Sequence, residues 1–202
     1  MKKLVLASNN PGKIRELRHL LAPLDIEVIA QADLAIPEAE EPHSTFVENA
    51  LAKARQAARI GGLPALAEDS GICVDALEGA PGVHSARFAG EPKSDQRNNE
   101  RLLELLATSE RRGAHYYCVA VLLRSAQDPQ PVIAEGEWHG EILRAPRGSG
   151  GFGYDPLFLV SAIGRTGAEL SMQEKNRISH RGQAMGRLLE RLRARLQQEG
   201  SL

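Results

Sequence analysis

The sequence is poor in cysteine and in aromatic residues, has almost no net charge and contains no long apolar run. Its two cysteines, Cys73 and Cys118, are far apart and form no CxxC pair, so we expect buried thiols in a reducing compartment. With 25 basic against 26 acidic residues, it lacks the basic surface by which proteins bind DNA or RNA. Residues 1–7 are too short for a signal sequence, and no apolar run reaches the about 18–20 residues of a membrane helix. We therefore expect a cytoplasmic globular protein that binds neither a nucleic acid polymer nor a membrane.

The order of apolar patterns predicts an α/β fold. Short apolar runs that indicate strands alternate with helical patterns in the first third of the chain, and longer β-branched runs at 116–123 and 131–143 predict a hairpin. Thr45 with Glu48, and Ser171 with Glu174, form capping boxes that predict helix starts. We expect an elongated mixed β-sheet flanked by helices, within a single domain over residues 1–202.

The segment "LASNNPGKIREL" passes from an apolar strand through a polar loop into a helical pattern. Such a junction places backbone N–H groups and the positive end of the helix dipole at one point, which favours phosphate binding. Lys13 adds a full positive charge there. The loop is not a Walker A motif, because Ala7 and Ile14 stand where that motif has Gly and Ser or Thr. A plain turn with a solvated Lys13 is the alternative.

Acidic residues follow the next apolar run. Asp69 follows the apolar run at residues 65–67, so we expect it at the carboxyl end of a strand, where α/β sheets bind ligands. A carboxylate there can bind a metal or take a proton from water. Glu41, or less favourably Glu40, offers a second carboxylate, and two carboxylates with a phosphate suffice for Mg²⁺. An Asx-turn at residues 69–71 and a solvated acidic loop at residues 38–41 are the alternatives.

Two later motifs suggest recognition of a planar group. "SGGFGYDP" carries Phe152 and Tyr154 among glycines, where an aromatic ring can stack on a base. Its alternative is a loop that plugs the core with Phe152. "EKNRISHRGQA" gathers the donors Lys175, His180 and Arg181 near the start of the last helix, and its alternative is a solvated helix terminus.

Five motifs together resemble the inosine triphosphate pyrophosphatase family: "SNNPGK", "EEPHSTFVENALAKA", "EDSGICVDALEGAPGVHSAR", "GSGGFGYDPLF" and "EKNRISHRGQA". These enzymes hydrolyse non-standard purine nucleoside triphosphates such as ITP, dITP and XTP to the monophosphate and pyrophosphate, which cleanses the nucleotide pool. The resemblance runs from residue 4 to about residue 190. It implies a two-lobed fold with the active site in the cleft between the lobes, Mg²⁺ dependence and a homodimer.

The resemblance also implies roles for single residues. Asp69 is the implied general base and a metal ligand, with Glu41 as the other ligand and Glu40 as a weaker choice. The implied substrate contacts are Ser8, Asn9, Asn10, Pro11, Gly12, Lys13 and Lys53 for the phosphates, Ser70 beside Asp69, and Phe152, Gly153, Tyr154, Asp155, Lys175, His180 and Arg181 for the base. The sequence departs from bacterial relatives at Glu68, where "DDSG" is usual, and at His43, where Gly is usual.

Two other functions stay open at this stage. One is a related pyrophosphatase with a different base preference. The other is a non-catalytic nucleotide-binding module, against which the pair Asp69 and Glu41 argues, because phosphate binding alone needs no paired carboxylates.

Overall fold

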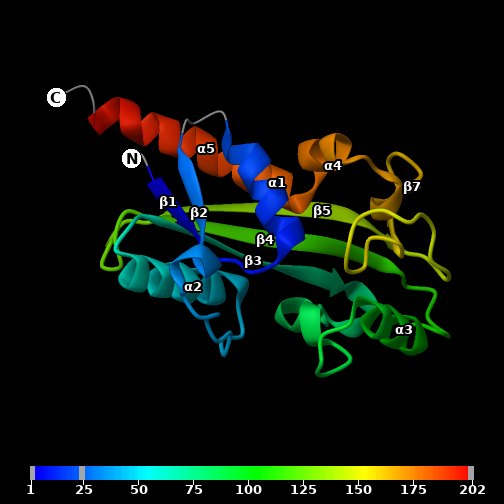
Figure 1. The fold of residues 1–202 in the computed structure, drawn as a ribbon. Coiled ribbons are helices and arrows are strands. Elements are labelled where there is room, and N and C mark those ends of the chain that lie inside the picture. Colours follow the sequence, from blue (N-terminus) through cyan, green and yellow to red (C-terminus); the bar gives the residue numbers. More distant parts are fainter. Residues whose placement is uncertain (1–2, 23–25, 200–202) are drawn as a thin grey trace. The chain divides into compact units, whose positions relative to one another are not determined.

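The computed structural model describes residues 3–22 and 26–199, and it is a mixed α/β protein (Figure 1). The strands are β1 (Lys3–Leu6), β2 (Glu27–Ala30), β3 (Ala65–Val74), β4 (Gly113–Leu123), β5 (Val132–Ile142), β6 (Phe158–Val160) and β7 (Arg165–Thr166). The helices are α1 (Pro11–Leu21), α2 (Phe46–Gly61), α3 (Asp95–Leu105), α4 (Met172–Ile178) and α5 (His180–Glu199). The sheet has the order β2-β1-β3-β4-β5-β6-β7, with β1 parallel to β2 and β3, and β6 antiparallel to β5 and β7. The predicted mixed sheet with helices is confirmed.

The predicted helix starts are also confirmed. The Thr45 hydroxyl accepts a hydrogen bond from the Glu48 amide at 3.4 Å and donates to the Glu48 carboxylate at 2.5 Å, so it caps α2. Gly62 ends that helix in the left-handed conformation with φ 63°. Ser171 caps α4 through a 3.3 Å bond from the Glu174 amide.

The described chain divides into two compact units, which we treat separately. Unit 1 comprises residues 1–69, 118–136 and 181–202, and unit 2 comprises residues 70–117 and 137–180. Because β3, β4 and β5 are long, each contributes residues to both units.

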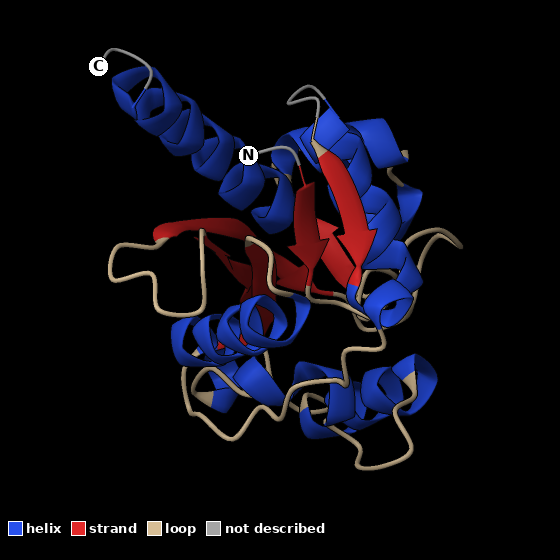
Figure 2. Ribbon diagram, turned by 60° about the vertical axis from the view of Figure 1, so that its left-hand side comes forward, coloured by secondary structure: helices blue, strands red, loops and turns tan. Residues whose placement is uncertain are grey.

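Unit 1 has helices on both faces of its strands. Helices α1 and α5 cover one face, and α2 covers the other (Figures 1 and 2). Leu17 of α1 and Met185 of α5 pack with Leu4 and Leu66 of the strands in one apolar core. The opposite helix α2 uses small buried residues: Ala50, Ala54 and Ala57 are fully buried. Alanines let this helix approach the sheet closely, which brings the polar residues of α2 next to β3.

Helix α5 is tied to β5 by a row of arginines. Arg187 donates to the carbonyl of Glu135 at 2.6 Å, Arg191 donates to the carbonyl of Ile133, and Arg195 donates to that of Gln130 at 2.8 Å. The spacing of four residues between these arginines places them on one helix face. Among the described helices, α5 included, none combines the length and the apolar character needed to cross a membrane.

Unit 2 has its own core around aromatic side chains. Tyr116, Trp138 and Phe158 pack together with aliphatic residues from α3 and β3, such as Leu102 and Ile72. Of the two cysteines, Cys118 is buried in unit 1 as expected, whereas Cys73 in unit 2 is only half-buried.

The structure corrects one expectation about β3. The sequence predicts that a strand ends near Asp69, with a turn at residues 69–71 as the alternative, but β3 runs without a break from Ala65 to Val74. Gly71 is needed for clearance rather than for a turn, because a Cβ atom there would lie 2.2 Å from the carbonyl oxygen of Gly82 and 2.5 Å from the Ser85 hydroxyl. The Asx-turn alternative is therefore wrong, and Asp69 lies within a strand.

Candidate active site

The opening loop is organised by its own side chains. Residues 8–13 join β1 to the first turn of α1 and are exposed or half-buried throughout. The carboxamide oxygen of Asn10 accepts hydrogen bonds from the amides of Gly12 at 2.9 Å and Lys13 at 3.2 Å, and the Ser8 hydroxyl accepts one from the Asn10 amide at 3.2 Å. A phosphate bound here would share these amides with Asn10 or displace its side chain, and Lys13 would supply the full positive charge.

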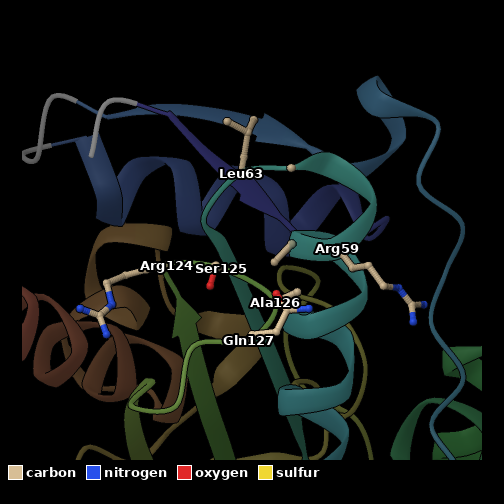
Figure 3. A pocket seen from close by; sticks show the side chains of 8 residues that line it. Arg59, Leu63, Arg124, Ser125, Ala126 and Gln127 are labelled. Atoms are coloured by element: carbon tan, nitrogen blue, oxygen red, sulfur yellow. The ribbon is translucent and has the colours of Figure 1, made fainter.

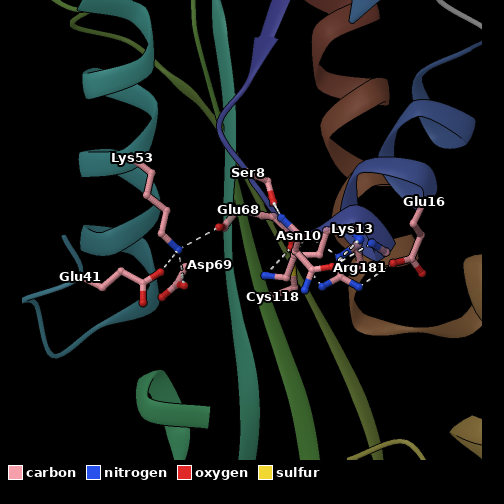
Figure 4. Close-up of polar contacts among 11 residues, drawn as sticks. Ser8, Asn10, Lys13, Glu16, Glu41, Lys53, Glu68, Asp69, Cys118 and Arg181 are labelled. Atoms are coloured by element: carbon pink, nitrogen blue, oxygen red, sulfur yellow. Dashed lines mark hydrogen bonds and ion pairs between the residues drawn. The ribbon is translucent and has the colours of Figure 1, made fainter. Parts of the chain in front are cut away.

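Lys13 begins a chain of buried charges in unit 1 (Figure 4). Its ammonium lies 2.9 Å from the carboxylate of Glu68. Arg181 holds Glu68 with two hydrogen bonds, of 2.6 Å and 3.0 Å, and donates a third, of 2.6 Å, to Glu16. The side chains of Glu68 and Arg181 are 2% and 1% exposed, whereas that of Lys13 is 20% exposed. Lys13 is thus the member of this chain of charges that reaches solvent, although its ammonium is paired with Glu68 rather than fully solvated.

Electrostatics keep this chain of charges ionised. Burial acts to raise the pKa of Glu68, but the positive charges of Arg181 and Lys13 outweigh it and hold that pKa well below the usual range. Burial also raises the pKa of the Cys118 thiol, which lies 3.6 Å from Glu68, so the thiol stays protonated. Cys118 is therefore an inert neighbour of the carboxylate.

A second polar cluster of unit 1 surrounds Lys53 of α2 (Figure 4). Its ammonium lies 2.7 Å from Asp69 and is also paired with Glu41. Asn49, one helical turn earlier, donates to the other carboxylate oxygen of Asp69 at 3.4 Å. Burial raises the pKa of Asp69 despite the opposing charge of Lys53, whereas the two carboxylates raise the pKa of Lys53 against its own burial. The cluster therefore contains a carboxylate that holds a proton more readily than an exposed aspartate does.

The alternation of side chains along β3 separates the two clusters. Glu68 and Asp69 are successive strand residues, so their side chains point to opposite faces, toward α1 and α5 in one case and toward α2 in the other. Leu66 pairs with Leu6, the last residue of β1. Both acids thus lie just beyond the carboxyl end of β1. The prediction that Asp69 lies at the end of its own strand is wrong, because β3 continues to Val74. Ser70 follows Asp69 and is half-buried.

The donor set suits a magnesium ion. Among the described residues no group of three or more His, Cys, Asp or Glu side chains could hold a metal by itself. However, the carboxylates of Glu41 and Asp69 converge on one positive charge, the ammonium of Lys53. Two carboxylates meeting at a cation match the protein share of a Mg²⁺ site completed by substrate phosphates and water. Glu40 is exposed, whereas Glu41 points into the cluster, so the geometry favours Glu41 and excludes the solvated-loop alternative for it.

In unit 2, three residues of the later motifs meet. Lys175 of α4 lies 2.5 Å from the carboxylate of Asp155, and its ammonium lies 4.5 Å from the centre of the Phe152 ring. Asp155 also accepts a hydrogen bond from the Phe152 amide at 2.9 Å. Lys175 is 6% exposed and Asp155 is 1% exposed, whereas Phe152 is half-buried. A half-buried ring can stack on a base, and an oriented ammonium next to it can donate hydrogen bonds to the oxygen atoms of that base.

Tyr154 is a core residue rather than an exposed stacking ring. It is 3% exposed, and its hydroxyl donates to the carbonyl of Ser85 at 2.8 Å. The alternative of a core plug is thus correct in kind, but Tyr154 fills that place instead of Phe152. The neighbouring Gly153 amide donates to Asp95 at 2.7 Å, which anchors the loop to α3.

The last motif is buried, so its reading as a solvated helix terminus is wrong. His180 is 4% exposed and stacks on Tyr116, with ring centroids 4.6 Å apart, and more distantly on Trp138. Arg181 turns to Glu68 and Glu16 of unit 1 instead of joining Lys175. The base-reading roles of Lys175, His180 and Arg181 stay predictions.

Sequence reasoning missed two residues of these clusters. Asn49 binds both Asp69 and the carbonyl of His43, at 3.4 Å and 3.1 Å. Its signal is a polar residue on the otherwise alanine-lined face of α2. Glu16 pairs with Arg181, which is 165 positions away, and nothing in the local sequence marks that pair.

A pocket of about 260 Å³ lies near the end of α2, away from these clusters (Figure 3). It is lined by Ala58, Arg59, Gly62, Leu63, Arg124, Ser125, Ala126 and Gln127. Arg59 and Arg124 point in opposite directions, and Arg124 is bound by Asp128 at 2.8 Å. Because its charged groups do not converge, we do not assign the active site to this pocket.

Comparison with known proteins agrees with the motif resemblance. A family model described as Ham1 family matches residues 4–191. The chain is 65% identical over 196 residues to the dITP/XTP pyrophosphatase of Ralstonia nicotianae, which covers 96% of this chain and 98% of that protein. It is 63% identical over 192 residues to the dITP/XTP pyrophosphatase of Nitrosomonas europaea, which covers 95% of each. The structure of a HAM1 protein from Coxiella burnetii matches with a TM-score of 0.90 at 49% identity, covering 96% of this chain and 100% of that one.

Proposed function

Because the chain belongs to the Ham1 family, we propose that it hydrolyses the non-standard purine nucleoside triphosphates dITP, XTP and ITP to the monophosphate and pyrophosphate. This reaction removes such nucleotides from the pool before they enter DNA or RNA. The observation that carries the proposal is the shared ammonium of Lys53, on which the carboxylates of Asp69 and Glu41 converge beside the Lys13 loop. The near full-length identity to dITP/XTP pyrophosphatases supports the substrate class.

The phosphates bind to unit 1. Lys13 is the solvent-reaching ammonium at the start of α1 and takes the outer phosphates, with the loop residues 8–12 around it. Lys53 neutralises further phosphate charge, since it is already oriented by two carboxylates. Gripping the outer phosphates leaves the α-phosphorus to the attacking water, so the α–β anhydride bond breaks and pyrophosphate leaves.

Glu41 and Asp69 hold the divalent ion, for which we propose Mg²⁺. When bound, this ion supplies charge neutralisation and polarisation at the phosphates. Asp69 accepts the proton of the attacking water, while Lys53 and Asn49 orient its carboxylate from α2. Its raised pKa, caused by burial, makes it a better base than an exposed aspartate.

The residues proposed to bind the base, apart from Arg181, belong to unit 2. Phe152 stacks on the purine, and Lys175, held by Asp155, donates to the oxygen at the six-position. His180 adds a donor in the same unit. Arg181, which Glu68 and Glu16 hold, is also proposed to contact the base.

Adenine carries an amino group where hypoxanthine and xanthine carry oxygen. An adenine nucleotide would therefore meet these donors with another donor and leave buried groups unpaired. A homodimer, a cytoplasmic location and a single functional domain over residues 1–202 remain part of the proposal.

The test is pyrophosphate release across dITP, ITP, XTP, the standard nucleotides and a pyrimidine panel, with and without Mg²⁺. We expect release only with Mg²⁺ and at least tens-fold preference for the first three over ATP, as expected for unpaired donors. Preference for a pyrimidine would favour the related pyrophosphatase. Tight triphosphate binding without pyrophosphate release would identify a non-catalytic module. Light scattering coupled to size-exclusion chromatography tests whether the protein is a dimer.

A further inference from the structure

Glu68 stands out in unit 1 because it is a buried carboxylate with two cationic partners of different kinds. Arg181 grips both of its oxygens, at 2.6 Å and 3.0 Å, and is itself fixed by Glu16 on the other side. Lys13 approaches the same carboxylate at 2.9 Å from the solvent side. Glu68 therefore has a fixed position, whereas Lys13 has a long side chain that can leave.

The charges of this cluster balance only while Lys13 is present. Glu16 and Glu68 carry two negative charges, and Arg181 carries one positive charge, so Lys13 brings the sum to zero. Glu68 needs no second cation to satisfy its oxygens, because a bidentate arginine already does so. The contact with Lys13 thus serves the lysine more than the carboxylate.

A fixed acceptor restricts where the ammonium of Lys13 can lie. Without Glu68, the side chain of an exposed lysine samples many rotamers, and holding it in one place costs conformational entropy when a ligand binds. The same acceptor also competes with a phosphate for the ammonium. Glu68 should therefore weaken the binding of a polyphosphate, while it keeps the ammonium of Lys13 at the loop before a ligand arrives.

We propose that Glu68 is a positioning residue that holds the ammonium of Lys13 in the free enzyme and gives it up to the triphosphate of the substrate, while the two hydrogen bonds from Arg181 keep Glu68 in place. The proposal rests on the proposed role of Lys13 as a phosphate ligand. It assigns to Glu68 an effect on Lys13 alone and no contact with the substrate.

Glu68→Gln tests this role, with Glu16→Gln as the matched control. Both changes remove one carboxylate partner of Arg181, but only the first touches Lys13. For Glu68→Gln we expect the dissociation constant of inorganic tripolyphosphate, measured by calorimetry, to fall about threefold or more, because a phosphate no longer competes with a carboxylate for the ammonium. KM should fall with it, while kcat changes less than about threefold, since Lys13 lies on the phosphate in both proteins. Glu16→Gln, and Glu68→Asp, which keeps the charge, should bind tripolyphosphate like the wild type.

Equal changes of tripolyphosphate affinity in Glu68→Gln and Glu16→Gln, or weaker tripolyphosphate binding in Glu68→Gln, would overturn the proposal, because a structural role of the Arg181 cluster predicts those results. If Glu68→Gln does not fold, crystal structures of the wild-type protein with and without tripolyphosphate decide. Lys13 should move from Glu68 to the phosphate while the Glu68–Arg181 bonds persist, and a Lys13 that stays on Glu68 refutes the exchange. Failure of this proposal can be distinguished from failure of the proposed function. Tripolyphosphate has no base, so it can still bind Lys13 and draw it from Glu68 in a protein that hydrolyses no purine nucleotide.

Discussion

Lys53→Met removes the ammonium that Asp69 and Glu41 share, so the change tests the core of the candidate site. The side chains of Lys53 and Asp69 are 12% and 7% exposed, and that of Glu41 is 22% exposed. Removing one partner of a buried ion pair costs about 3–5 kcal/mol, and the partial exposure of Glu41 places the expected loss near 3 kcal/mol. At about 2–4 °C per kcal/mol for a chain of this size, the melting temperature should fall by roughly 6–12 °C.

Magnesium should reverse much of this loss. With methionine at position 53, two carboxylates face each other without a cation, and Mg²⁺ can take that place. An ion present at about 100 times its dissociation constant adds about 2.7 kcal/mol of stability. The melting temperature of the variant should therefore rise steeply with MgCl₂ in a thermal unfolding assay, while turnover stays low because Lys53 also neutralises phosphate charge.

Lys3→Met is the control for this experiment. Its pair with Glu27 is exposed, at 54% and 58%, so its loss should cost no more than about 1 kcal/mol and show no dependence on magnesium. The reasoning is refuted if Lys53→Met has the melting temperature of the wild type, or if MgCl₂ raises the melting temperatures of Lys53→Met and Lys3→Met equally. Either result would mean that Glu41 and Asp69 do not form one cation site.

Three further results are expected. Glu41→Gln should lower turnover by about 10²-fold or more, because it removes a metal ligand. The same change at the exposed neighbour, Glu40→Gln, should leave turnover near that of the wild type. The reverse order of effects would assign the ligand role to Glu40. Since burial raises the pKa of Asp69, kcat/KM should begin to fall with decreasing pH at a pH above the usual aspartate range. Asp69→Asn should lower the activity of a folded protein by about 10²–10⁴-fold. Wild-type turnover in that variant would show that Asp69 is not the base. Lys175→Met should reduce kcat/KM for ITP roughly tenfold more than for ATP, whereas equal reductions would place base recognition elsewhere.

The sequence predicted local structure well where the signal is local. Thr45 and Ser171 cap the expected helices, and the long strands around residues 116–123 and 131–143 are neighbours in the sheet. Glycine was misleading at position 71. A Ser-Gly pair after an acid is typical of a turn, and only the approach of the Gly82 carbonyl, 11 positions further along, explains why Gly stands inside a strand.

The partners of the charged residues were beyond reach of the sequence. Lys175, His180 and Arg181 are close in sequence, which favoured a single cluster, yet Lys175 pairs with Asp155 and Arg181 pairs with Glu68. Ion pairs between residues 113 positions apart depend on how α5 and β3 pack, and no periodicity encodes that packing. The residue types at the site could be predicted from the motifs, but the division of those residues into separate groups required the structure.

The arginine row on α5 has a consequence for how the protein avoids aggregation through its β-strands. Strand β6 pairs with β5 at Glu141 and Ile142, whereas the carbonyls of Ile133 and Glu135 lie toward the other end of the strand, where Arg191 and Arg187 bind them. Uncovered carbonyls on a strand are a template for a strand of another molecule, which is how many sheets aggregate. Because the guanidinium groups of Arg187 and Arg191 already donate to these carbonyls, the carbonyls cannot readily accept hydrogen bonds from the N–H groups of another strand. Helix α5 thus shields an aggregation-prone edge, and a protein shortened before Arg187 would expose that edge together with the apolar core beneath it.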